Sequence, residues 1–99
     1  MWEAYIKGFK AYLQLERNLS ANTIDAYLHD IALLAEFVRL NDSGKAVESI
    51  ALADLQSFLM HINELEFASC SQARIISGIK AFFRYLLLEE VIRLDPTAF

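Results

Sequence analysis

The stretch SCSQARIISGIKAFFRYLLL, residues 69–88, decides the fold. At about 100° per residue along a helix, its large apolar side chains share one broad face, which is wide enough for a core helix: Ile75, Ile76, Ile79, Phe82, Phe83 and Leu86. The opposite face carries Arg74, Ser77, Lys80 and Arg84, and the stretch contains no acidic residue. The stretch holds three of the nine basic residues in the chain. The other six basic residues and all thirteen acidic residues lie outside it. Three positive charges are therefore concentrated on one helix of an acidic protein.

Composition limits the class of protein. The chain has 99 residues, of which 56% are hydrophobic, and it contains one proline and three glycines. These values favour one compact, helix-rich domain. The net charge of −4 does not favour general nucleic-acid binding, but phosphates respond to local charge. The single cysteine, the absence of a signal-peptide pattern and the charges that interrupt every apolar run predict a cytoplasmic protein with no membrane association.

The apolar periodicity predicts four helices and no strand, an all-α bundle. Their expected ranges are about 2–17, 21–40, 52–65 and 70–90. Between the second and third helices, Val47 and Ile50 are expected to fill part of the core. After the fourth helix, Asp95-Pro96 prevents continuation, and an extended tail is expected to reach Phe99.

Local signals place the helix starts. Ser20 is a good N-cap for the second helix. Ser69 and Gln72 have the spacing of a capping box, in which each side chain bonds the backbone N–H of the other residue. The third helix lacks such chemistry, because alanine occupies position 51.

No catalytic or metal-binding motif is present. His29, His61 and Cys70 lack the spacing of a zinc site, and Ser69 is better explained as a cap than as a nucleophile. The three glycines form no phosphate-binding loop. The sequence therefore predicts no catalytic residue, metal or cofactor.

The basic face of the fourth helix has two interpretations. It is either a solvated surface or a surface for a DNA groove, with long side chains reaching phosphates and base edges. In the second helix Asn22, Thr23 and His29 offer a matching polar surface, whereas Asp25, Asp30 and Glu36 weigh against phosphate contact along its whole length. A helical protein–protein interaction module, in which the basic face is only solvated, is the alternative function.

Two motifs resemble a known family. The pattern FxxYLxxERNLSxNTxxAYxxDI over residues 9–31, the run ARIISGIKAFFRYL over residues 73–86 and the Asp95-Pro96 pair are similar to the N-terminal core-binding domain of the tyrosine recombinases, the Xer and phage-integrase group. The resemblance covers nearly the whole chain. It implies a four-helix, SAM-like bundle that forms one half of a clamp around duplex DNA.

The resemblance also implies site residues and partners. The second and fourth helices would face the duplex, and the DNA-binding residues would be Asn22, Thr23, His29, Arg74, Ser77, Lys80 and Arg84.

The first helix would help to pack recombinase protomers together in a synaptic complex, which gives Trp2 and Leu15 a possible role, while the isolated fragment would be a monomer. Residues 1–99 would form the core-binding domain, with the linker to a missing catalytic domain starting at about 94–99. The arginine, lysine, His-x-x-Arg and tyrosine of the family's catalytic set have no match here, so the fragment alone is expected not to be an enzyme.

Four residues at three places depart from the family pattern. Leu28 and His29 replace residues that are often basic, Ala51 replaces a threonine or serine cap, and Asp95 stands where asparagine is common. The first departure predicts weaker DNA binding. We also expect that alanine at Arg74, Lys80 and Arg84 weakens duplex binding and leaves the fold intact.

Overall fold

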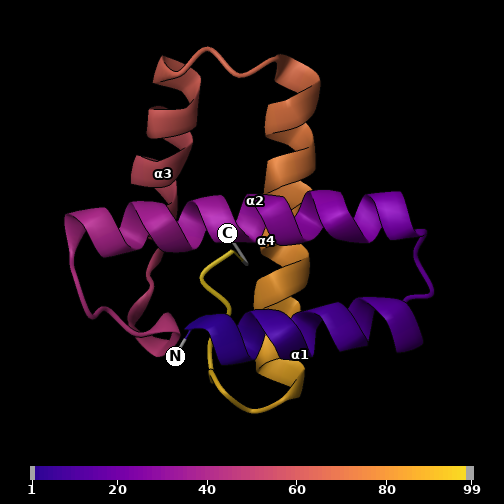
Figure 1. Ribbon diagram of the computed structural model, residues 1–99. Coiled ribbons are helices and arrows are strands. Elements are labelled where there is room, and N and C mark those ends of the chain that lie inside the picture. The colour runs from indigo at the N-terminus through magenta and orange to yellow at the C-terminus, as the bar shows by residue number, and fades with distance from the viewer. Residues whose placement is uncertain (1, 98–99) are drawn as a thin grey trace.

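The computed structural model describes residues 2–97, and these form an all-α domain (Figure 1). Its elements are the helices α1 (Trp2–Leu15), α2 (Ala21–Asn41), α3 (Leu52–Glu64) and α4 (Ser69–Leu88), with the short 3-10 helix η1 (Val47–Ser49) before α3. No strand occurs within the described range. The predicted fold class is confirmed.

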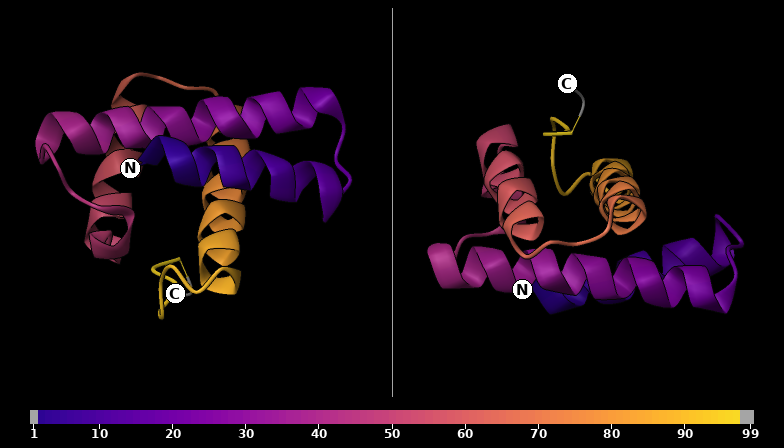
Figure 2. Two further views of the ribbon diagram at one scale, coloured as in Figure 1. Left: turned by 60° about the horizontal axis from the view of Figure 1, so that its bottom comes forward. Right: turned by 90° about the horizontal axis from the view of Figure 1, so that it is seen from above.

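The helices form two crossed layers. In Figure 1, α1 and α2 run antiparallel to each other in front, and α3 and α4, also antiparallel, run across them behind. Seen from above in Figure 2, α3 and α4 stand almost end-on over the layer made by α1 and α2. The helices α2 and α4 each pack against all three of the others, and the contact between them is the most extensive, so their crossing is the centre of the bundle.

The core lies between the two layers. Its aromatic part joins α1 to α4: the ring centroids of Phe9 and Phe82 are 5.2 Å apart, and those of Phe82 and Phe83 are 5.5 Å apart. Trp2 stacks on Phe82, and its indole N–H donates to the carbonyl of Lys45 at 3.0 Å, which ties α1 to the loop after α2. The remaining fully buried apolar residues come from all four helices and from η1: Leu13, Ile31, Leu34, Val47, Phe58, Ile62, Ile75 and Leu86.

One residue of the expected apolar face of α4 lies outside the core. Ile76 is 36% exposed, and it lines an open hollow between α3 and α4 together with Leu52, Leu55 and Thr97. The position of Ile76 on the helix turns it past the buried face towards α3, and α3 does not close over it.

The predicted start of α2 is confirmed, whereas the capping box at α4 is wrong. Ser20 Oγ accepts a hydrogen bond from the backbone N–H of Thr23 at 3.2 Å. The helix α4 begins one residue earlier than expected, so its N-cap is Ala68 and Ser69 lies inside the first turn. The amide of Gln72 donates instead to the carbonyl of Phe67, at 2.8 Å.

The start of α3 is stabilised by a side chain three residues inside the helix. Ala51 has no side-chain acceptor, but its backbone N–H donates to Asp54 Oδ2 at 2.8 Å. Asp54 also accepts from Lys45 Nζ at 3.0 Å. Partial burial opposes the charge of Asp54, but the bonds from Ala51 and Lys45 outweigh this effect and lower its pKa.

Three helices end earlier than the periodicity predicts, at Leu15, Glu64 and Leu88 instead of residues 17, 65 and 90, whereas α2 ends one residue later, at Asn41. After α3 and α4, Glu66 and Glu90 adopt the left-handed conformation, with φ of 62° and 60°. The next backbone N–H groups, of Phe67 and Val91, then bond back to the carbonyls of Ile62 and Leu86 at 3.3 and 2.9 Å. This is the Schellman arrangement, in which glycine usually occupies the left-handed position.

The two irregular segments pack against the bundle. Val47 and Ile50 are buried, as predicted. The prediction of an extended tail is wrong for residues 91–97, because Ile92 and Pro96 are buried and Asp95 Oδ1 accepts from the backbone N–H of Thr97 at 2.8 Å. The aspartate thus holds a turn in the tail, and the end predicted at Phe99 lies outside the described residues.

Replacing Gly8 with alanine should destabilise the domain. A Cβ at position 8 would overlap the hydroxyl of Tyr85, whose ring is held by Phe9 and Tyr12 at centroid distances of 5.9 and 5.3 Å. The overlap should outweigh the gain in helix propensity of about 1 kcal/mol and leave a net loss of about 1–2 kcal/mol in the free energy of unfolding by urea.

The matched control is Gly8→Ala in a Tyr85→Phe background, where the hydroxyl is absent and the loss should shrink. An increase in stability from Gly8→Ala with Tyr85 intact would contradict the packing described.

Asp54→Asn should remove a pH-dependent contribution to stability. The pKa of Asp54 is lowered in the folded state, so its stabilising effect is complete above the unfolded pKa of about 3.9 and is lost as the pH falls through the folded pKa. We expect the variant to lose about 0.5–1 kcal/mol at pH 7. The difference from the original protein, measured by urea unfolding, should shrink as the pH falls below about 3.9 and through the lowered folded pKa; a difference that is constant with pH would contradict this assignment.

Candidate nucleic-acid interface

The outward face of α4 presents three of the predicted residues. Ser77, Lys80 and Arg84 are exposed, and they recur at three- and four-residue spacing on the side opposite the core. No ion pair engages Lys80 or Arg84 within residues 2–97. Two cations separated by about one helical turn therefore remain available for an anionic partner.

Arg74 is held differently from the other two cations. Its Nε and Nη2 atoms donate to Asp30 Oδ2 and Oδ1, both at 2.9 Å, in a bidentate pair between α4 and α2. Asp30 is fully buried, while the Arg74 side chain is 42% exposed. The hydrogen bonds to Asp30 raise the pKa of Arg74 further above its usual value.

This pair corrects the sequence interpretation of both residues. Asp30 was expected to weigh against phosphate contact along the second helix, but it is a buried partner of Arg74. Arg74 lacks an acidic neighbour on its own helix but has one on α2. An alanine at Arg74 would therefore leave a buried carboxylate unpaired, so the expectation that the triple alanine variant keeps the fold intact is revised.

One turn further along α4 from Arg74, the helices α2 and α4 approach each other closely. An added Cβ at Gly78 would lie 3.2 Å from the ring of Tyr27, so the ring packs directly on the α4 backbone. Ser77 precedes this contact and Arg74 lies one turn before it. Together, the Tyr27–Gly78 contact and the Asp30–Arg74 pair fix how the basic face of α4 is oriented relative to α2.

The predicted residues of α2 are not all joined to that face. Asn22 and His29 are exposed and share one side of α2, since seven residues complete nearly two turns. Thr23 is half-buried, and its Oγ1 accepts from the Ser20 hydroxyl at 2.9 Å, so it supports the cap. In the described part of the chain no hydrogen bond or ion pair joins Asn22, Thr23 or His29 to the basic residues of α4.

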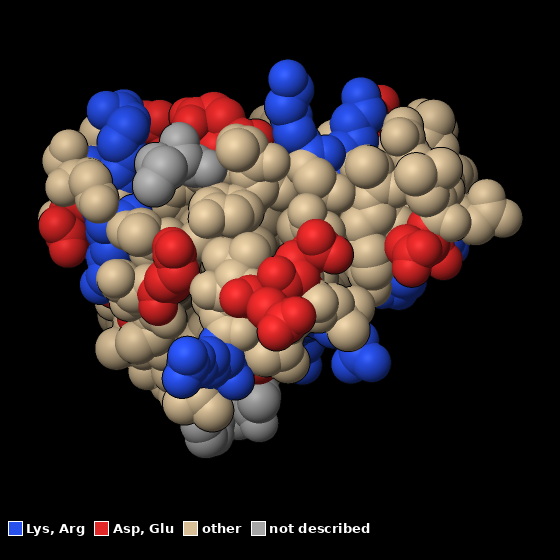
Figure 3. All heavy atoms as spheres, turned by 90° about the horizontal axis from the view of Figure 1, so that it is seen from below, with Lys and Arg blue, Asp and Glu red and all other residues tan. Residues whose placement is uncertain are grey.

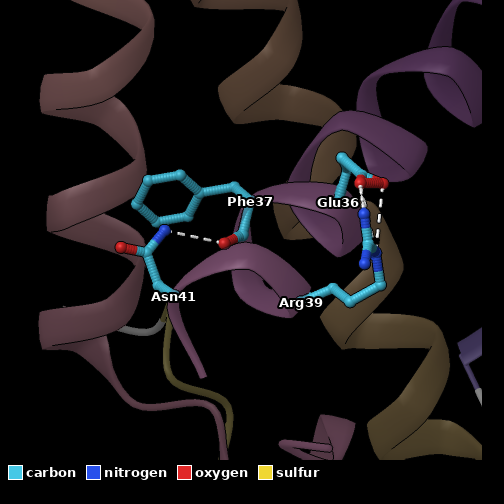
Figure 4. A network of polar contacts seen from close by, with 4 residues as sticks. All are labelled: Glu36, Phe37, Arg39 and Asn41. Carbon is cyan, nitrogen blue, oxygen red and sulfur yellow. Dashed lines mark hydrogen bonds and ion pairs between the residues drawn. The ribbon is translucent and has the colours of Figure 1, made fainter. Parts of the chain in front are cut away.

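The C-terminal half of α2 is unsuited to phosphate. Figure 4 shows that the Arg39 guanidinium turns back onto Glu36, and Arg39 Nε lies 3.1 Å from Glu36 Oε2. This partner lowers the pKa of Glu36. In the same turn the side-chain amide of Asn41 donates to the carbonyl of Phe37 at 2.8 Å. The local charges are therefore already paired with each other.

The face of the molecule seen from below carries no uniform charge either. In Figure 3, lysine and arginine atoms lie mostly around its margin, while acidic groups are spread across its middle. A polyanion would meet repulsion over much of this face. The outward side of α4 is thus the better candidate for a basic contact surface.

No metal centre is found among residues 2–97, where no three histidine, cysteine or acidic side chains are grouped closely enough to hold an ion. The His61 ring packs against Phe37 at a centroid distance of 5.0 Å. Within the same range, no helix has the length and apolar character needed to cross a membrane.

Comparison with known proteins decides the family. Residues 6–90 match the model of the phage integrase N-terminal SAM-like domain. The chain belongs to this family. The matched residues include the helices that carry the candidate interface, from most of α1 to the end of α4.

Curated relatives of this SAM-like domain are tyrosine recombinases. The chain is 36% identical to tyrosine recombinase XerD of Agrobacterium fabrum over 95% of its own length and 28% of the relative's. It is 33% identical to XerC of Lacticaseibacillus casei, over 92% and 30% of the two lengths, and 34% identical to XerD of Chlorobaculum tepidum, over 96% and 31%. The chain thus spans roughly a third or less of each relative's length.

Sequence reasoning missed the role of Asp30 in this SAM-like domain. A usable signal was present, because Asp30 follows the half-buried Tyr27 by three residues and precedes the buried Leu34 by four. These spacings place it beside the apolar stripe of α2, where an acidic residue needs a partner. Its partner is 44 residues away in the chain, and one sequence does not identify it.

Arg74→Ala should destabilise the SAM-like domain, whereas Lys80→Ala and Arg84→Ala should not. Loss of Arg74 leaves the Asp30 carboxylate buried and unpaired, and we expect a cost of about 2–3 kcal/mol, below the range for fully buried pairs because Arg74 is partly solvated. Exposed Lys80 and Arg84 should each change stability by less than about 0.5 kcal/mol.

Urea unfolding of the three variants measures these differences. A double-mutant cycle with Asp30→Ala gives the coupling energy between Asp30 and Arg74. Equal stability of all three single variants would contradict a structural role for the pair.

Proposed function

We propose that this domain binds duplex DNA as the N-terminal part of a site-specific tyrosine recombinase and holds the duplex at the recombination site. The observation that carries the proposal is the outward face of α4, which presents Lys80 and Arg84 without an acidic partner in residues 2–97 on a chain of net charge −4. Membership of the integrase family and relatives named tyrosine recombinases supply the biological context.

The mechanism on this chain is positioning. Lys80 and Arg84 would contact phosphates, Ser77 would allow close approach of the helix, and Arg74 would be held at a fixed place beside them. At the start of α2, Asn22 and Thr23 stand next to the helix N-terminus, whose free N–H groups favour a phosphate. His29, on the same side of α2 as Asn22, would extend this second contact.

Cleavage and rejoining would belong to another domain. The chain spans only 28–31% of the three relatives described above, and residues 2–97 carry no cluster typical of the family's catalytic set. In this proposal residues 1–99 are the core-binding half of a DNA clamp, and the linker to the catalytic half begins near Leu94. The protein would act in the cytoplasm, and the isolated domain would be a monomer.

Contacts with other protomers in a synaptic complex would use the outer side of α1. Leu15 is 81% exposed at the end of that helix and is free to meet a neighbour. Trp2 is a weaker candidate, because its ring stacks on Phe82 and its N–H is bonded within the domain. The other exposed large apolar residues are spread over α2, α3, α4 and the segments that follow α3 and α4, so they do not favour the alternative of a protein-interaction module: Leu40, Met60, Leu65, Ile76, Leu87, Leu88 and Leu94.

Duplex binding should depend on salt and on the two free cations of α4. With about three or four phosphate contacts, the logarithm of affinity should fall against the logarithm of salt concentration with a slope near −3 to −4. The Lys80→Ala/Arg84→Ala variant should bind more weakly, and its slope should be shallower by about 2. Fluorescence anisotropy with a labelled duplex of about 30 base pairs, beginning at low salt, measures both quantities.

The matched control is Lys7→Ala/Lys10→Ala, which removes the same charge from exposed positions on α1. It should keep most of the affinity and the slope. If the two double variants bind alike, or if the original protein does not bind at low salt, the proposed interface is refuted.

A further inference from the structure

The bidentate pair between Asp30 and Arg74 leaves part of a charged group facing solvent. Two of the five N–H donors of the guanidinium, on Nε and Nη2, are directed to Asp30. Of the other three, one on Nη1 and one on Nη2 point side by side and form the end edge of the same plane, while the second donor on Nη1 points to the side away from Asp30. Because the side chain is 42% exposed while Asp30 is fully buried, this free edge is the part that a ligand can reach.

The pair also fixes the direction of that edge. An unpaired surface arginine samples many rotamers and loses this freedom on binding. Here two 2.9 Å bonds to a carboxylate that is itself buried in α2 hold the plane in one orientation. The Tyr27–Gly78 contact keeps the two helices in register near it.

The charge of this site differs from that of Lys80 and Arg84. The carboxylate of Asp30 offsets the positive charge of Arg74, so a phosphate gains less from Arg74 than from an unpaired cation. The remaining donors are directional, and they suit a pair of neutral acceptors in a fixed plane. In the major groove of DNA the N7 and O6 atoms of guanine form such a pair.

We infer that Asp30 is a positioning residue that orients Arg74 to read a guanine edge in the major groove, while Lys80 and Arg84 contact the backbone. This inference rests on the proposed function, since it assigns sequence preference to one residue of the same surface. It divides the basic face of α4 into one arginine that specifies sequence and two cations that supply affinity.

The test is selection from a duplex library with ten randomised base pairs, followed by sequencing of the fraction bound to the 99-residue chain. The original protein should enrich guanine at one position by about 5- to 150-fold, the range of one good bidentate contact. Arg74→Lys keeps the charge and can still pair with Asp30, but it lacks the planar fork. It should lose the guanine preference at that position and keep the salt slope.

Asp30→Asn tests the positioning role. It keeps the size of the side chain and one acceptor but frees the guanidinium plane, so the guanine preference should weaken although Arg74 is unchanged. The Lys80→Ala/Arg84→Ala variant should show the opposite behaviour, with weaker binding to all sequences and an unchanged preference. Circular dichroism checks each fold; if Asp30→Asn does not fold, Asp30→Glu, which keeps the buried charge but moves the carboxylate by one methylene, replaces it and should weaken the preference with Arg74 intact.

The outcomes separate this inference from the proposed function. No binding of the library by the original protein would overturn both. Binding that depends on Lys80 and Arg84, combined with no guanine preference or with a preference that survives Arg74→Lys, would overturn the role of Arg74 and leave the proposed function intact. A preference that Arg74→Lys removes and Asp30→Asn preserves would overturn the positioning role of Asp30.

Discussion

The architecture depends on how closely α2 crosses α4. A small residue at Gly78 lets the Tyr27 ring lie on the α4 backbone, and one turn away the buried carboxylate of Asp30 receives two hydrogen bonds from Arg74. The aromatic contact is short-range and apolar, while the ion pair is directional, so the two together restrict both the distance and the rotation between the helices. The remaining helices pack around this crossing: α1 lies beside α2, and α3 beside α4 (Figure 2).

The crossing also connects stability to the proposed DNA contact. A basic helix on a mobile scaffold would pay for its own ordering on binding, whereas α4 is held by a buried aromatic core on one side and by α2 on another. The cost of burying Asp30 is offset only while Arg74 stays in place. Arg74 therefore both stabilises the fold, through its pair with Asp30, and contributes to the proposed DNA-binding surface. Few substitutions at this position can satisfy both roles.

Much of the fold was predictable from sequence, because strong apolar periodicity determines which residues are buried. The four helices, the cap at Ser20 and the burial of Val47 and Ile50 follow from local patterns. One failure has a local cause and the other a tertiary cause. Gln72 bonds Phe67 instead of forming a capping box with Ser69, and the tail turns because Ile92 and Pro96 find apolar neighbours in the bundle.

The candidate site was only partly predictable for a related reason. The spacing of Ser77, Lys80 and Arg84 on one helix face is a local property, and these residues are exposed as expected. Whether Arg74 is free depends on a residue of another helix, 44 positions away, and no helical period contains that information. The relation of Asn22 and His29 to the same surface likewise depends on the angle between α2 and α4.

The ends of α3 and α4 have a consequence for the unfolding of the domain. Glu66 and Glu90 occupy a backbone conformation that glutamate disfavours, and they stay there because Phe67 and Val91 pack against the core just beyond them. The length of each helix is thus set by the hydrophobic anchor that follows it and not by a local stop signal. If Phe67 or Val91 loosened, its helix could lengthen by relaxing the glutamate to a right-handed conformation, so secondary structure in a partly unfolded state could exceed that of the native domain at these two places.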